Sequence, residues 1–159
     1  MSGIASHLRR TMLLVGVTAG SLGCDPFGLV GAGNDELEES RARWENLSMT
    51  SYEYVVARSC FCPPSFLGPV RVRVEDGVVT ARTFVDGTDT GLDEPGSWFP
   101  SVEGLFDLLA EAYERDAHRV EVTYDPETGV PLDVYIDYEE YIADEEQGFS
   151  VQSLPVPVS

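Results

Sequence analysis

The sequence is short of basic residues, and this shortage narrows the kinds of partner the protein can have. Its 159 residues include 28 acidic side chains against 10 basic ones, which gives a formal net charge of −18. Such a chain repels phosphate backbones and anionic lipid headgroups, so we expect no nucleic-acid binding. A partner attracted by charge would be cationic: a basic protein, a polyamine or a metal ion. The alternative interpretation of the acidic surface is solubility alone.

Histidine is also scarce, and the common catalytic motifs are missing. The two histidines are His7 and His118, and no G-x-S-x-G, H-E-x-x-H, P-loop or dinucleotide-binding pattern occurs. A Ser–His or Cys–His centre in the mature chain would have to use His118. That residue follows "ERDA" and is expected instead to cap the end of a helix. We therefore expect a binding or interaction module that needs no cofactor, rather than an enzyme.

The sequence lacks a hydrophobic run long enough to span a membrane. Its N-terminal apolar run, Thr11–Leu22, falls well short of the about 20 helical residues that a bilayer core requires. The run follows Arg9 and Arg10 and contains no acidic residue. These features are typical of a secretory signal peptide, which we assign to residues 1–23.

The end of this leader suggests a lipid anchor. It reads "SLGC", which resembles the lipobox of bacterial lipoproteins and predicts lipidation of Cys24, although Ser21 stands where that pattern prefers Leu. The protein would then be membrane-anchored in the extracytoplasmic part of the cell envelope. Cleavage after Ala19 or Ser21, leaving Cys24 as a free thiol, is the alternative. Lipidation would leave an even pair among the three cysteines, as an oxidising exterior favours.

The mature chain divides into three parts. Residues 24–34 contain several glycines and no periodicity, so we expect a flexible tether. Residues 35–154 are sufficient for one domain with its own core. Residues 155–159, rich in proline and valine, are expected to be a disordered tail.

Two segments have helical periodicity. Residues 34–47 begin with Asn34 or Asp35 as a cap, followed by acidic side chains that suit the positive end of a helix. Residues 99–119 have Ser101 as N-cap and apolar side chains at i, i+3, i+4 and i+7. That stripe predicts a buried helix face rather than a cofactor site.

Strand periodicity predicts about six strands. In the hairpin over residues 69–85, Asp76 and Gly77 form a two-residue turn. The register then places Val79, Ala81 and Thr83 on the face of the preceding valines. The other strands are expected within residues 51–60, 118–138 (a second hairpin) and 148–154.

The element order is therefore helix, three strands, helix, three strands. This order predicts an α+β fold, with two helices packed on one face of an antiparallel sheet of about six strands. Hairpin connections argue against a parallel, doubly wound sheet.

Several stretches together resemble domain-of-unknown-function family 6174. They are "SYEYVV", "CFCPP", "PVRVRVEDGVV", "SVEGLFDLL" and "VTYDPETGVPLDVYID" with a following "ADEE", and they cover roughly residues 44–154. Val130 is a departure, because the family typically has an aromatic residue before Pro131. The resemblance implies a small exported bacterial domain, often a lipoprotein. It implies no activity, and so no catalytic residue.

Cys60 and Cys62 in "RSCFCPP" are the residues of this sequence best suited to disulfide, redox or metal chemistry. In a regular strand both thiols point to one side with Cα atoms about 7 Å apart, at the limit for a disulfide. The bend that Pro63 and Pro64 impose could shorten that distance, and an exported pair should oxidise. A structural disulfide is the favoured interpretation, with a thiol redox role as an alternative.

Two metal sites are weaker alternatives. Cys60 and Cys62 could hold Cu(I), or bind zinc together with His118 and a carboxylate. Oxygen ligands for calcium could come from the acidic stretch near the C-terminus, namely Asp133, Asp137, Asp144 and Glu145. A solvated acidic surface explains the same residues without a metal. The loop "DGTDTGLDEPGS" does not match a calcium-binding EF-hand, because Ser97 stands where that loop requires Glu.

Overall fold

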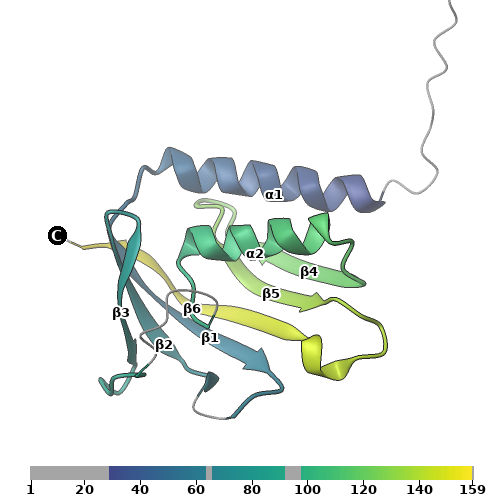
Figure 1. The fold of residues 1–159 in the computed structure, drawn as a ribbon. Helices are drawn as coiled ribbons and strands as arrows, with labels where there is room; N and C mark the ends of the chain where they lie inside the picture. The colour runs from purple at the N-terminus through teal and green to yellow at the C-terminus, as the bar shows by residue number, and fades with distance from the viewer. Residues whose placement is uncertain (1–28, 64–65, 92–97, 159) are drawn as a thin grey trace, which may run out of the picture.

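A computed structural model describes residues 29–63, 66–91 and 98–158, and confirms the predicted fold class and element order (Figure 1). The predicted leader and Cys24 lie outside the described residues. The elements are α1 (Leu29–Asn46), β1 (Tyr52–Cys60), β2 (Val70–Glu75), β3 (Val78–Phe84), α2 (Val102–Glu114), β4 (Arg119–Tyr124), β5 (Pro131–Asp137), a 3₁₀ turn η2 (Ala143–Glu145) and β6 (Gln147–Pro157).

The sheet is a single antiparallel layer in the order β3-β2-β1-β6-β5-β4. Each half is a meander of three consecutive strands, and the halves meet where β1 pairs with β6. Both helices cover one face, with α1 lying along α2 (Figure 1). No helix of the described residues covers the opposite face, which we call the uncovered face.

The core lies between the sheet and the helices and follows the predicted periodicities. Alternate residues of β1 and β2 are fully buried, as are the apolar positions of α2 that recur every three or four residues. Ser101 caps α2 as predicted, its Oγ accepting the N–H of Gly104 at 3.1 Å. The predicted turn is also confirmed, because Asp76 and Gly77 both have positive φ.

The prediction of which β3 residues face the core is right for Val79 and wrong for Ala81 and Thr83. Val79 faces the core side opposite Val74, as expected. A bulge then shifts the register, so that Arg82 rather than Ala81 or Thr83 continues that face. The extra residue of a bulge moves every following side chain to the other side of the sheet. Ala81 and Thr83 therefore lie on the uncovered face.

The ends of the domain also differ from the prediction. Helix α1 begins at Leu29, so part of the expected tether is helical. At the other end, β6 continues through Pro157, into the expected tail. Pairing explains this extension, since Pro157 lies opposite Tyr52 of β1. A proline at the end of a strand is tolerated because it gives up only one donor.

His118 does not cap a helix. Helix α2 ends at Glu114, and Asp116 takes the positive φ that follows the helix end. The backbone N–H of His118 instead donates to the carbonyl of Tyr138 at 3.4 Å, next to the β4–β5 pairing.

None of the helices in the described ranges is long and apolar enough to cross a membrane.

Candidate functional site

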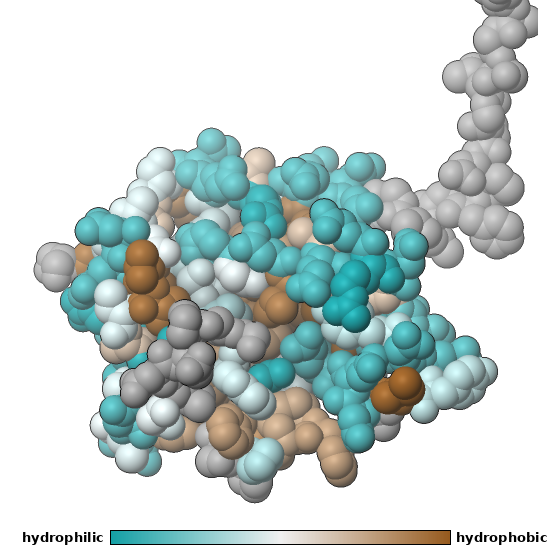
Figure 2. All heavy atoms as spheres, in the orientation of Figure 1, coloured by the Kyte–Doolittle hydropathy of each residue, from teal (hydrophilic) through white to brown (hydrophobic). Residues whose placement is uncertain are grey.

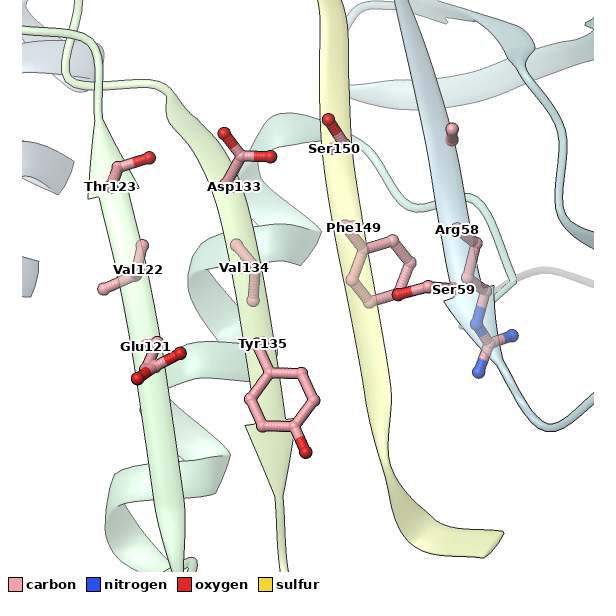
Figure 3. Close-up of a pocket in the computed structure, with 11 residues that line it drawn as sticks. Arg58, Ser59, Glu121, Val122, Thr123, Asp133, Val134, Tyr135, Phe149 and Ser150 are labelled. Carbon is pink, nitrogen blue, oxygen red and sulfur yellow. The ribbon is translucent and has the colours of Figure 1, made fainter. Parts of the chain in front are cut away.

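The uncovered face of the sheet carries a groove of about 520 Å³ (Figure 3). It crosses four adjacent strands, β4, β5, β6 and β1, whose side chains alternate between this face and the core. Val134 and Phe149 point to the core side and are buried. On each of these two strands, the residues directly before and after the buried one point to the uncovered face and are polar or small.

Two cross-strand rows form the groove. The first row runs Thr123, Asp133, Ser150 and Ala57, each paired with the next across a strand boundary. The second row, one step along the strands, runs Glu121, Tyr135, Gly148 and Ser59. Figure 3 shows the carboxylate of Asp133 between the hydroxyl-bearing Thr123 and Ser150. The groove thus combines two carboxylates, hydroxyl groups and one aromatic ring.

Gly148 makes the hollow possible. A Cβ on this residue would lie 2.4 Å from Ser59 Oγ and 2.9 Å from the Val134 carbonyl oxygen. Any larger residue would therefore push β1 and β5 apart or fill the groove. The small side chains of Ala57 and Ser150 likewise leave the space above the neighbouring part of the sheet open.

The two carboxylates of the groove differ in how their charge is balanced. Glu121 accepts a hydrogen bond from Arg119 Nη2 at 2.5 Å, on the same strand. Asp133 is exposed, and in the described part of the chain its carboxylate has no hydrogen bond or ion pair to another residue. Asp133 is therefore the groove carboxylate that is available to an external cation.

Tyr135 forms one wall and lies among charged groups. The guanidinium of Arg119 is 5.5 Å from its ring centroid. Desolvation raises the pKa of Tyr135, and the charge of Glu146 with its hydrogen bond to the phenol raises it further. Tyr135 is therefore a neutral aromatic surface and a hydrogen-bond donor at ordinary pH.

A half-buried arginine, Arg58, lies on the helix side of the same strands. The Arg58 guanidinium stacks 4.4 Å from the Trp98 ring centroid and 5.6 Å from that of Phe149. Nη2 donates to Gln147 Oε1 at 3.3 Å, whereas Nε and Nη1 are buried without a hydrogen-bond partner among the described residues. Burial lowers the pKa of this guanidinium. The stack attaches Trp98 to the sheet, so that the chain entering α2 is anchored beneath the groove.

Cys60 and Cys62 are joined by a disulfide at the end of β1. Their Cα atoms are 5.3 Å apart, shorter than a regular strand would give and within the range for a disulfide. The chain leaves strand geometry directly after Cys60, as the prolines predicted. Phe61, between the two cysteines, is 83% exposed.

The structure does not bring the proposed zinc ligands together. His118 precedes β4, which is three strands from β1 and so roughly 14 Å away across the sheet. The two sulfur atoms are bonded to each other. Over residues 29–63, 66–91 and 98–158, no three His, Cys, Asp or Glu side chains are grouped so as to hold a metal ion.

The proposed calcium ligands are likewise separated. Asp133 lies in the groove, while Asp137, 9% exposed, accepts the backbone N–H of Glu139 at 3.2 Å. Asp144 and Glu145 are exposed on η2. Of the four, Asp133 alone contributes to the groove.

Sequence reasoning missed most of the groove. Ser59, Thr123, Tyr135 and Ser150 are ordinary polar positions of alternating strands, and they become neighbours only through the strand order. The one usable signal is the pair Gly148 and Ser150, two small residues at alternate positions of the predicted last strand.

The hollows described on the helix side are smaller than the groove. In the orientation of Figure 1, hydrophilic side chains cover both helices, and the apolar areas in view are separate from one another (Figure 2). A second hollow of about 470 Å³ lies between β3 and α2. Its acidic residues Asp107 and Glu111 are already paired with Arg41 and Arg115.

Comparison with known proteins gives one result. A family model described as a family of unknown function, DUF6174, matches residues 36–156. No curated protein and no solved structure matches the chain.

Proposed function

The chain belongs to DUF6174, and from this premise we propose that it is a non-catalytic binding module whose open-face groove holds a cationic segment of a partner protein. The observation that carries the proposal is the exposed carboxylate of Asp133 in a polar groove, without a counter-ion from the described residues. An ammonium or guanidinium group placed there would gain an ion pair. The hydroxyls of Thr123 and Ser150 lie beside it to accept further hydrogen bonds.

The charge of the whole molecule supports a basic partner. A net charge of −18 attracts cationic segments from a distance and raises their rate of encounter. The shape of the groove supports a segment rather than a free ion, because a trough across four strands can contact several residues of an extended chain. Calcium is disfavoured, since it prefers six to eight oxygen ligands, and the groove gathers few carboxylates.

We place this module outside the cytoplasm, attached to a membrane through lipid on Cys24. The support is the leader: two arginines, an apolar run without acids, and "SLGC" at its end. The Cys60–Cys62 disulfide is compatible with an oxidising compartment. A Cys24→Ser variant should lose metabolic labelling with a fatty acid, and labelling that persists would contradict the anchor.

Binding to the groove can be measured with a labelled peptide of alternating arginine and serine, (Arg-Ser)₄, by fluorescence anisotropy of the purified full chain. We expect saturable binding that weakens with added salt, and none to (Glu-Ser)₄. Asp133→Asn should weaken binding about fivefold, the effect of losing one partly exposed ion pair.

Glu114→Gln is the matched control for this measurement. Glu114 is exposed at the end of α2, on the helix side of the sheet, and its replacement removes the same unit of charge. It should change the affinity by less than about twofold. Equal losses in both variants would mean that the peptide responds to overall charge and that the groove is not its site.

A further inference from the structure

The loop held by the disulfide presents an aromatic side chain to solvent. Phe61 is 83% exposed, which is unusual for so large an apolar residue, and it lies between two bonded cysteines. The small ring restricts the backbone on both sides of Phe61. This restricts the direction in which the side chain leaves the backbone before any partner arrives, which lowers the entropy cost of binding to it.

This residue lies at one end of the groove. A smaller hollow of about 260 Å³ is lined by Ser59, Cys60, Phe61, Tyr135 and Glu146. It shares Ser59 and Tyr135 with the groove that contains Asp133. The two hollows therefore adjoin at Ser59 and Tyr135, and together they are called the trough, with the carboxylate of Asp133 in one hollow and the exposed phenyl ring of Phe61 in the other.

We propose that Phe61, with Tyr135, forms an apolar subsite, so that the ligand is an extended protein segment carrying a basic residue and a large apolar residue. This inference rests on the proposed function of the groove and adds its specificity. The basic residue would pair with Asp133. The apolar residue would lie against Phe61 and cover surface that is now exposed to water.

The strand register gives the spacing between the two residues. Ser59 and Gly148 are level with Tyr135, two residues along β5 from Asp133. Phe61 lies two strands across from β5 and two residues beyond Ser59, just past the end of β1 at Cys60. With about 3.4 Å per residue and about 4.8 Å per strand, the two ends of the trough are at most about 17 Å apart. An extended segment covers that distance in about five residues.

Charge favours a protein segment over a lipid surface. Glu146 lines the hollow next to Phe61, and Glu139 and Glu140 are in the same β5–β6 connection. These carboxylates would repel anionic headgroups, whereas they would attract a basic segment.

The test uses two labelled peptides that differ only at the apolar position, Arg-Arg-Ser-Gly-Ser-Gly-Leu-Leu and Arg-Arg-Ser-Gly-Ser-Gly-Ser-Ser, with anisotropy measured on the full chain. The wild-type protein should bind the leucine peptide about tenfold more tightly, the effect of burying part of an apolar side chain. Phe61→Ala should abolish this preference and leave the affinity for the serine peptide within about twofold. Phe61→Leu should keep most of the preference, since the site would remain apolar.

Tyr141→Ala is the matched control. Tyr141 is 89% exposed, also an aromatic residue at the surface, and lines neither hollow. The leucine preference should survive this change. A preference that also survives Phe61→Ala would overturn the subsite and leave the groove standing. Failure of both peptides to bind, by contrast, would overturn the proposed function and the subsite with it.

Discussion

Gly129 shows how a single residue decides where α1 lies. It has a φ of 79° in the β4–β5 turn, and a Cβ there would lie 2.1 Å from the carbonyl oxygen of Ser40. Ser40 is fully buried in the middle of α1. The backbone of the turn and the backbone of the helix are therefore in direct contact. The "DPETG" stretch, prominent in the family resemblance, has this structural role.

Gly129→Ala should lower the free energy of unfolding by about 3 kcal/mol, because it combines a left-handed backbone with a clash against α1. Gly77→Ala is the control: Gly77 has a φ of 78°, and a methyl group added there would meet no atom within 4 Å. Gly77→Ala should lower the free energy of unfolding only by the cost of the left-handed backbone, about 1 kcal/mol. Equal losses in urea denaturation would show that the contact with α1 is unimportant.

Asp125 stabilises the same turn from within. Its Oδ1 accepts hydrogen bonds from the backbone N–H and the hydroxyl of Thr128, both at 2.7 Å, and these lower the pKa of the carboxyl below its ordinary 3.8. A lowered pKa in the folded state contributes stability above pH 3.8. That contribution disappears as the pH falls through the folded-state pKa.

Asp125→Asn should therefore cost about 1 kcal/mol at pH 7, and the difference from wild type should shrink below pH 3.8. Urea titrations at pH 7 and pH 3 measure it. Glu127→Gln changes a neighbouring, exposed acid of the turn, and should cost little at either pH. A loss for Asp125→Asn that is constant with pH would contradict the role of its charge.

At the scale of elements, alternation and helical periodicity predicted the type and order of both helices and all six strands. They could not predict the bulge that reverses the later part of β3, because its cause is pairing with β2. Nor could they predict that β6 reaches Pro157, since that length depends on β1 alongside it. Local pattern determines which element forms, whereas its ends and register depend on its neighbours.

The start of α2 is attached to the other elements through Glu103. Its two carboxylate oxygens accept from Trp44 Nε1 of α1 at 2.8 Å and from the Tyr52 hydroxyl of β1 at 2.6 Å. The same hydroxyl accepts the N–H of Val102 at 2.9 Å. Burial, followed by the hydrogen bond to Glu103, raises the pKa of Tyr52. One carboxylate thus connects both helices and the sheet.

Glu103→Gln should lower the free energy of unfolding by about 1–2 kcal/mol, because an amide can accept from one of these donors but not from both. Glu111→Gln, which loses only an exposed pair with Arg115, should cost less than about 0.5 kcal/mol. Urea denaturation followed by tryptophan fluorescence compares them. Similar losses would show that the buried network adds nothing to stability.

At the scale of the whole molecule, strand order creates the groove. Thr123 and Asp133 pair within one hairpin, but Ala57 and Ser150 join them only because β6 lies between β1 and β5. The sequence identified Asp133 as a candidate metal ligand, and the structure places it instead among hydroxyl groups. Composition predicts a cationic partner, and this stays a prediction; the position of the proposed site could be found only from the sheet topology.

Binding of a basic segment in the open-face groove is tested most directly by amide chemical-shift mapping of the folded protein during titration with (Arg-Ser)₄. We expect the largest saturable shifts at Ala57, Ser59, Asp133, Tyr135 and Ser150, with Asp133→Asn reducing them. Shifts centred on the acidic surfaces of α1 and α2, or spread evenly over the acidic residues, would contradict binding in the groove.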